Sequence, residues 1–208
     1  MIKTQYVGDE DDRDRLPWYL VRKESLTLQF WEVLVSIPLL IYLFLFPIIN
    51  CFDLIIPLEA NVKVWAVYGI FETIILADMV LRFCKVPEKM QEPSLKKTTE
   101  LYMAKGPFII DIIYTIICNT LLLKGDLITF SRLKMFTCLL KSCDIRAAAI
   151  FLINNFRQAT TVQKQMYKNL FNIVLSAFVT LHMIACLWIR LGSLDADLPA
   201  DQRESWLF

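Results

Sequence analysis

The sequence predicts an all-α membrane protein, built as a four-helix bundle followed by a fifth transmembrane helix. Hydrophobic residues make up 56% of the 208 positions, against roughly 45–50% in an ordinary soluble domain, and the mean hydropathy is +0.48. The apolar residues are gathered in long blocks with charged connectors between them, as in a protein that crosses a membrane several times. A membrane β-barrel would instead show alternating segments of about 10 residues.

Five apolar segments supply the predicted helices, and a membrane core needs about 20 residues for one crossing. They are Phe30–Phe52, Val64–Phe83, Pro107–Leu123, Leu127–Phe151 and Leu170–Leu191. Pro38 and Pro47 fall inside the first segment, which a membrane helix tolerates when neighbouring helices satisfy the freed carbonyl groups. The fourth segment is mixed in polarity because it also carries several charged residues.

These segments divide the chain into five parts. The predicted parts are a polar N-terminal segment (1–29), the four-helix bundle (30–153), a linker (154–168), the fifth helix (169–191) and a polar tail (192–208). The linker is polar and weakly amphipathic, so a simple interfacial loop is the alternative interpretation. The N-terminal residues lack the apolar stretch of a signal peptide and the acid-poor character of a transit peptide.

Lysine and arginine are distributed unevenly between the connectors. Most of them precede the first segment or lie between the second and third and between the fourth and fifth segments. Because basic loops stay on the side from which a membrane protein is inserted, we expect the N-terminus on the cytoplasmic or matrix side.

Several functional classes are not expected. The net charge of +1 gives no basic surface for nucleic acid, and no catalytic motif or cofactor loop points to an enzyme or a cofactor. His182 and Cys186 lie one helical turn apart, but two ligands do not make a metal site, so we expect His182 to form a hydrogen bond across helices. The six cysteines form no CxxC pair and are expected to be buried, inert thiols.

Charged residues inside the apolar segments are the main functional signal, because each costs a few kcal/mol at the centre of a bilayer. Acids in the second and third segments face bases in the fourth, and this predicted network comprises Glu72, Asp78, Arg82, Asp111, Arg132, Lys134, Lys141, Asp144 and Arg146. Two interpretations stay open. The charges hold the bundle together, or the fourth segment moves past the acids under a membrane potential.

Motifs spread along the chain resemble the voltage-sensor-containing cation channel superfamily, in its cyclic-nucleotide-gated-like branch. The first three segments carry Trp31, Pro38 and Tyr42, Cys51-Phe52-Asp53, Glu72, Asp78 and, in FIIDII, Asp111. The fifth segment carries LHMIACLWIRLG, and ESW follows it, with matching positions at His182, Cys186, Trp188, Gly192, Ser205 and Trp206. The resemblance runs from about residue 30 onward and implies a sensor domain, a fifth helix approaching a pore, and a plasma or ciliary membrane.

The chain also departs from this family. The family carries a base at every third residue of its fourth helix, but here that register reads Arg132, Met135, Cys138, Lys141 and Asp144. Ile75 stands where the family has a gate aromatic, and the sequence ends at Phe208, before the carbonyl filter that such a channel uses. We therefore expect no selective pore from this chain alone and no strong voltage sensor.

The expected function is that of a pore-less, channel-derived membrane protein acting as a non-conducting accessory subunit. Its expected partners are the lipid bilayer and other membrane subunits of a larger assembly. If that assembly is an energy-converting complex, the mitochondrial inner membrane is the alternative to a plasma or ciliary membrane. Two other functions remain open. The chain is the N-terminal part of a cyclic-nucleotide-gated-like cation channel, or it is a stand-alone sensor with a proton leak along Asp78, Asp111, Arg132 and Lys141.

Overall fold

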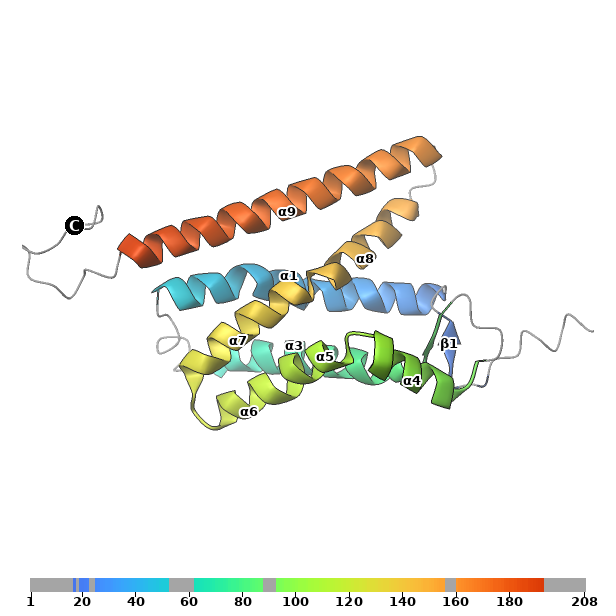
Figure 1. The fold of residues 1–208 in the computed structure, drawn as a ribbon, viewed down its shortest axis with the longest axis horizontal. Helices are drawn as coiled ribbons and strands as arrows, with labels where there is room; N and C mark the ends of the chain where they lie inside the picture. The colour runs from blue at the N-terminus through green and yellow to red at the C-terminus, as the bar shows by residue number, and fades with distance from the viewer. Residues whose placement is uncertain are drawn as a thin grey trace, which may run out of the picture.

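The computed structural model describes residues 17, 19–22, 25–52, 62–87, 93–155 and 160–192, with Lys105 described by its backbone alone. This part of the chain is mostly helical, and its successive helices run back and forth between the two ends of the molecule (Figure 1). They are β1 (Val21–Arg22), α1 (Leu26–Phe52), α3 (Val62–Phe83), β2 (Lys85–Val86), α4 (Leu95–Lys105), α5 (Phe108–Ile112), the π-helical turn η1 (Ile113–Ile117), α6 (Cys118–Leu123), α7 (Leu127–Leu140), α8 (Ser142–Asn154) and α9 (Thr161–Gly192).

Helices α1, α3 and α9 are each long and apolar enough to cross a membrane. A fourth crossing results if α4 and the run from α5 to α6, which are bent by 81° relative to each other, are counted as one broken span. The predicted helical fold is thus confirmed, and these helices are compatible with membrane insertion. The third predicted segment is interrupted by the π-helical turn η1 between α5 and α6, and the fourth is described below.

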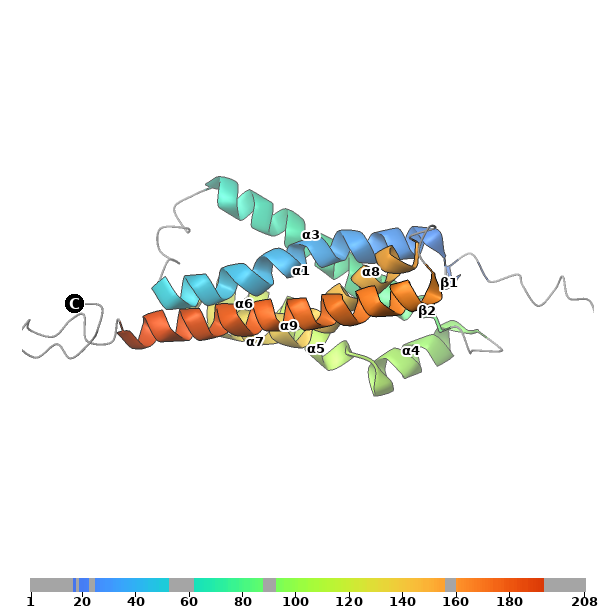
Figure 2. The same ribbon diagram turned by 90° about the horizontal axis from the view of Figure 1, so that it is seen from above.

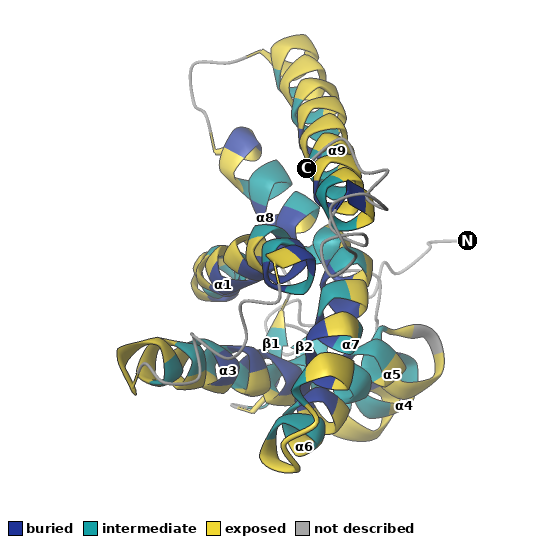
Figure 3. Cartoon of the chain, turned by 90° about the vertical axis from the view of Figure 1, so that its left-hand side faces the viewer, coloured by how far each residue is buried: buried dark blue, intermediate teal, exposed yellow. Residues whose placement is uncertain are grey.

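Helix α1 lies at the centre of the arrangement. Helices α7 and α8 cross it diagonally, α9 runs along one side of it, and α3 lies on the other side with α5 and α6 (Figures 1 and 2). The core is formed by side chains of α1 packed against α3, η1, α6, α7 and α8, among them Leu39, Leu43, Ile75 and Tyr114. Helix α9 is the least covered element, since most of its surface is exposed (Figure 3).

The two ends of the molecule differ. At one end, called here the strand end, β1 and β2 form a two-residue parallel pair in which Val21 faces Lys85. At the other, called here the turn end, α6 passes into α7 through a tight turn at Gly125, whose φ of +78° suits a residue without a side chain. The β1–β2 pair is not predicted by the sequence, which places 1–29 in a polar segment.

The fourth predicted segment is two helices and not one. Helix α7 ends at Leu140 and α8 begins at Ser142, because Lys141 between them has a non-helical ψ of 1°. The Lys141 side chain is buried at this break and pairs with Asp111. The break therefore coincides with a contact between the fourth segment and the third.

The second half of the predicted linker is helical, because α9 begins at Thr161. Thr160 and Gln163 form a reciprocal pair in which each side-chain oxygen accepts a hydrogen bond from the other residue's backbone N–H, at 3.3 and 2.9 Å. This is a capping box, which starts a helix by satisfying its free N–H groups. Most of the predicted polar tail, including Ser205 and Trp206, lies outside the described residues.

Candidate functional site: a buried charge network

The predicted intramembrane charges form two clusters at different depths of the bundle. The cluster nearer the turn end contains Glu72 of α3 and Lys134 of α7, whose Nζ lies 2.8 Å from Oε2 of Glu72. The Lys134 side chain is fully buried and that of Glu72 is 10% exposed. Asn119 of α6 donates to the same Oε2 at 2.9 Å, and Tyr68 donates to Oδ1 of Asn119 at 2.7 Å. Oε1 of Glu72 is buried without a hydrogen-bond partner among the described residues.

The cluster nearer the strand end is built around Arg82 at the end of α3. Its guanidinium lies 2.8 Å from Asp78, 3.6 Å from Asp111 of α5 and 2.8 Å from Asp144 of α8. Lys141 forms a second ion pair with Asp111. Three carboxylates against two cations leave this cluster with one formal negative charge when all five groups are ionised. It joins α3, α5, α7 and α8 at one level of the bundle.

Tyr114 of η1 lies between the two clusters. Its ring centroid is 3.7 Å from Nζ of Lys134 and 5.0 Å from Nζ of Lys141, and the side chain is fully buried. Lys134 also donates to the Tyr114 carbonyl oxygen at 3.0 Å. An aromatic ring thus lies between the two lysines. The family resemblance predicts an aromatic at position 75 instead, where this chain has Ile75, which is buried in the same core.

Two further aromatic residues bind the strand-end acids. The indole N–H of Trp31 on α1 donates to Asp78 at 3.2 Å. The Tyr102 hydroxyl on α4 donates to Asp111, which is completely buried. Trp31 is one of the family-like residues of the sequence, but its contact with Asp78 is not predicted. Tyr102 is not among the predicted residues. Each contact joins two helices, and a sequence pattern within one helix does not reveal it.

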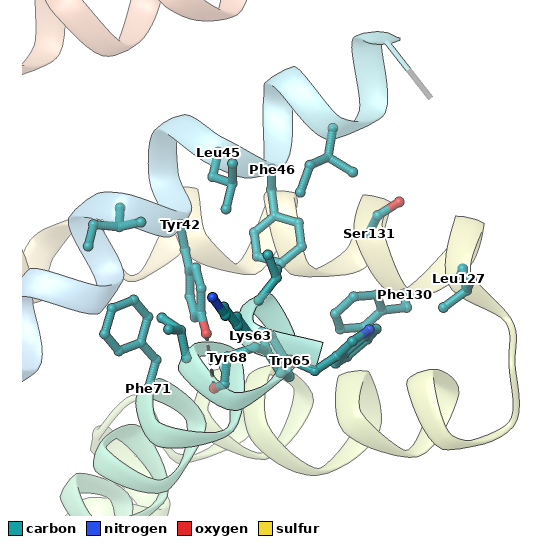
Figure 4. A pocket seen from close by; sticks show the side chains of 14 residues that line it. Tyr42, Leu45, Phe46, Lys63, Trp65, Tyr68, Phe71, Leu127, Phe130 and Ser131 are labelled. Carbon is teal, nitrogen blue, oxygen red and sulfur yellow. Dashed lines mark hydrogen bonds between the residues drawn. The ribbon is translucent and has the colours of Figure 1, made fainter. Parts of the chain in front are cut away.

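Access to the network differs between the two ends. Toward the turn end, a mostly apolar pocket of about 330 Å³ lies between α1, α3 and α7, and none of the clustered charges lines it (Figure 4). Its side chains include Phe46, Trp65 and Phe130, and the Tyr42 hydroxyl donates to the Tyr68 carbonyl at its edge. At the strand end, a smaller and more polar hollow of about 130 Å³ reaches the charges directly and is lined by Glu32, Asp78, Arg82, Lys85 and Asp144.

Two of the predicted charges stay outside both clusters. Arg132 is exposed on α7, and no ion pair among the described residues includes it. Arg146 of α8 donates from Nη2 to the Ser176 hydroxyl of α9 at 3.0 Å. Lys134 and Lys141 are seven residues apart and share one face of the fourth segment, and Arg132, two residues before Lys134, lies on a different face of α7. The predicted register starting at Arg132 therefore differs from the buried one, which starts at Lys134.

The family-like residues of α9 lie along its seam with α1. Nε2 of His182 is 2.9 Å from the Phe44 carbonyl oxygen, and Cys186 Sγ is 3.8 Å from the same nitrogen. Trp188 is on the exposed face of the helix. Within the described ranges, His, Cys, Asp and Glu side chains form no group of three able to hold a metal ion.

The charge network is thus assembled from seven of the nine predicted charges, with Trp31, Tyr68, Tyr102, Tyr114 and Asn119 as additional polar partners.

Comparisons with known protein families and with curated proteins give no match for this chain.

Proposed function

We propose that this chain is a non-conducting accessory subunit of a membrane assembly, related to the sensor part of voltage-gated-like cation channels. The observation that carries this proposal is the pairing of the two buried lysines of the fourth segment. Lys134 is bound by Glu72 and the Tyr114 ring, and Lys141 is bound by Asp111. These charges connect helices, and the energies involved favour a structural role for them.

A membrane potential supplies too little energy to separate both pairs. One charge that crosses a full 100 mV gains about 2.3 kcal/mol, so the two lysines together gain about 4.6 kcal/mol. Breaking a buried ion pair costs about 3–5 kcal/mol each time. Two broken pairs therefore cost more than the field provides, unless other bases take over the vacated acids.

No base of the fourth segment stands ready to replace them. One turn beyond each lysine, the buried face carries Cys138 and Ile145, and one turn before Lys134 it carries the buried Ser131. A shift of the helix by one turn in either direction would leave Glu72 facing an uncharged side chain and would leave Asp111 without a base from the fourth segment. The network consequently favours one position of the fourth segment.

The surface of α9 supports the assembly role. Apolar side chains such as Ile173, Phe178 and Leu181 are about two-thirds exposed, and polar side chains at Gln165, Asn169 and Thr180 lie among the exposed residues of the same helix. Polar groups on a membrane helix usually face protein and contribute to helix association. We therefore place a partner subunit on α9.

Photo-crosslinking in the native membrane tests this proposal. A photoreactive amino acid replaces Phe178 on α9 or, as the matched control, Val80, which is similarly exposed on α3. We expect a discrete protein adduct from position 178 and lipid adducts alone from position 80. Lipid adducts alone at both positions, together with a monomeric mass in mild detergent, would overturn the accessory role.

The N-terminal part of a cation channel is the second candidate, and the place of Tyr114 favours it. The Tyr114 ring lies between Lys134 and Lys141. In a voltage sensor, a lysine that moves from Glu72 to Asp111 would pass this ring. Charge-movement recordings from the full chain separate the candidates. The accessory role predicts no voltage-dependent charge movement, whereas a movement that Lys134→Gln abolishes would establish sensing.

A proton leak is the least favoured candidate. It needs water on both sides of the charges, but the pocket toward the turn end is lined mostly by apolar and aromatic groups, with Lys63 and Ser131 as its polar members. We expect proteoliposomes that hold the chain to be silent. Proton currents that disappear with Asp111→Asn would support the leak instead.

A further inference from the structure

The seam between α1 and α9 holds two buried cysteines near the turn end of the molecule. Cys51 is the second-last residue of α1, and Cys186 lies six residues before the end of α9. Their exposed fractions are 5% and 8%. Both are expected from the sequence to be inert thiols, and the proposed accessory role uses neither of them.

The two residues are in direct contact. The Sγ–H of Cys51 donates to the backbone carbonyl oxygen of Cys186. A carbonyl oxygen lies about 2.4 Å from its own Cα, so Sγ of Cys51 is close to the backbone that carries the second sulfur. Disulfides form between cysteines whose Cα atoms are about 4.4–6.8 Å apart. The Cys186 thiol lies 3.8 Å from Nε2 of His182, so a bond to Cys51 requires the Cys186 side chain to rotate away from that histidine.

The other four cysteines are placed differently. Cys84 is near the strand end and Cys143 is exposed on α8. Cys118 and Cys138 are buried deep in the bundle, where Cys138 contacts the Tyr114 hydroxyl. Among the described cysteines, Cys51 and Cys186 are therefore the pair at the turn end, where α1 ends.

The turn end is also the side that meets an oxidising compartment under the predicted orientation. With the basic connectors on the cytoplasmic or matrix side, Cys51 ends its helix on the opposite face of the membrane. That face borders the endoplasmic reticulum lumen and the cell exterior, or the intermembrane space. Disulfides persist in extracellular and lumenal compartments.

We propose that Cys51 and Cys186 form a disulfide that fastens α9 to α1. The reaction is an exchange with an oxidised dithiol oxidoreductase of that compartment. The Cys51 thiolate attacks the disulfide of the oxidoreductase, and the Cys186 thiolate then resolves the mixed disulfide. One S–S bond forms in this chain while one is reduced to two thiols in the oxidoreductase, so two electrons and two protons leave the cysteines.

The bond would close a loop that contains most of the chain, from the end of α1 to the outer part of α9. The cross-link restricts the unfolded chain and holds α9 in a fixed relation to the bundle. It also complements the hydrogen bond between His182 and the Phe44 carbonyl on the same seam. Helix α9 would then present its exposed face to a partner as a fixed surface.

Thiol counting on the full chain in its native membrane tests the proposal. Free thiols are blocked with N-ethylmaleimide in denaturant, the protein is reduced, and the newly released thiols are labelled with a maleimide polymer that retards the band on a gel. We expect two labels on the wild-type chain and none on Cys51→Ser or Cys186→Ser. The matched controls Cys84→Ser and Cys143→Ser should retain both labels.

Peptide mass spectrometry of the unreduced wild-type chain provides a second measurement that needs no variant. We expect a linked peptide pair that contains Cys51 and Cys186. A wild-type chain with all six thiols free overturns the proposal, as does a linkage between other cysteines or between two copies of the chain. Labels that persist in Cys51→Ser would overturn it as well.

Discussion

The ammonium group of Lys134 lies 3.7 Å from the centroid of the Tyr114 ring, and the same group donates a hydrogen bond to the Tyr114 carbonyl oxygen. One residue therefore binds the lysine with both its side chain and its backbone. A desolvated contact between a cation and an aromatic ring is worth about 2 kcal/mol. Together with Glu72, Tyr114 makes it favourable to hold a charge in the interior of the bundle.

Replacing Tyr114 should separate the effect of its ring from that of its hydroxyl. Tyr114→Phe keeps the ring and loses only a weak contact with Cys138, so we expect a change in the free energy of unfolding below about 1 kcal/mol. Tyr114→Ala leaves a cavity and removes the cation–π contact, and we expect a loss of about 3–5 kcal/mol. Thermal unfolding in detergent, followed by size-exclusion chromatography, measures both.

A substitution at Ile117 is the matched control, since this residue lies in the same π-helical turn with an exposed side chain. Ile117→Ala should change the unfolding temperature little. If Tyr114→Ala were as mild as Ile117→Ala, the ring would not support the lysine, and it would not hold the fourth segment in one position.

Removal of the Lys134 charge should be more harmful than removal of the whole ion pair. Lys134→Met leaves Glu72 buried and unpaired, and we expect a loss of about 3–5 kcal/mol. The double variant Lys134→Met, Glu72→Gln removes both charges and should recover most of the loss. The exposed Arg132 on the same helix is the control, and Arg132→Met should be close to neutral. Losses that simply add in the double variant would show that the two residues are not coupled.

Local sequence patterns predict much of the fold. Length and hydropathy identify the segments that become α1, α3 and α9, since a membrane helix satisfies its own backbone and needs only enough apolar residues. The acids Glu72, Asp78 and Asp111 stand out for the same reason, as charges in apolar surroundings. Such signals depend on neighbours along the chain and are readable from the sequence.

The partners of these acids depend on contacts between distant segments. A three-residue spacing suggests Arg132 as the first base of the fourth segment, but the buried bases are Lys134 and Lys141, the latter at the break in the helix. The seven-residue interval between the two lysines is the signal that marks this face. The sequence gives a weaker indication of the role of Tyr114, namely that this residue lies one helical turn after Asp111.

Trp31 offers a direct test of the contact between α1 and the strand-end cluster. Trp31→Phe keeps an aromatic side chain and removes the N–H that donates to Asp78, and a hydrogen bond to a charged group contributes about 1.5–3 kcal/mol. We expect a loss of about 1.5 kcal/mol, because Trp31 is only partly buried. A double-mutant cycle with Asp78→Asn measures the coupling, and a coupling energy near zero would contradict the assignment of this contact.

The three acids around Arg82 should differ in importance according to their burial. Their side chains are 1% exposed at Asp111, 7% at Asp78 and 25% at Asp144. Asp111→Asn leaves Lys141 buried without its carboxylate, so we expect a loss of about 3–5 kcal/mol and reduced assembly. Asp144→Asn removes a partly solvated partner and relieves the negative charge of the cluster, so we expect a loss of about 1 kcal/mol or less.

The order Asp111, Asp78, Asp144 in the cost of each Asn substitution is thus the expected result, measured as the unfolding temperature and as the yield of assembled protein. Glu100→Gln is the control, because Glu100 is well exposed beside Lys96 on α4. The order follows from desolvation. When a buried carboxylate is replaced by an amide, water cannot take its place beside the cation, so the loss is larger than at an exposed position. Equal losses at all three positions would mean that the cluster responds to its total charge and that the individual ion pairs do not decide its stability.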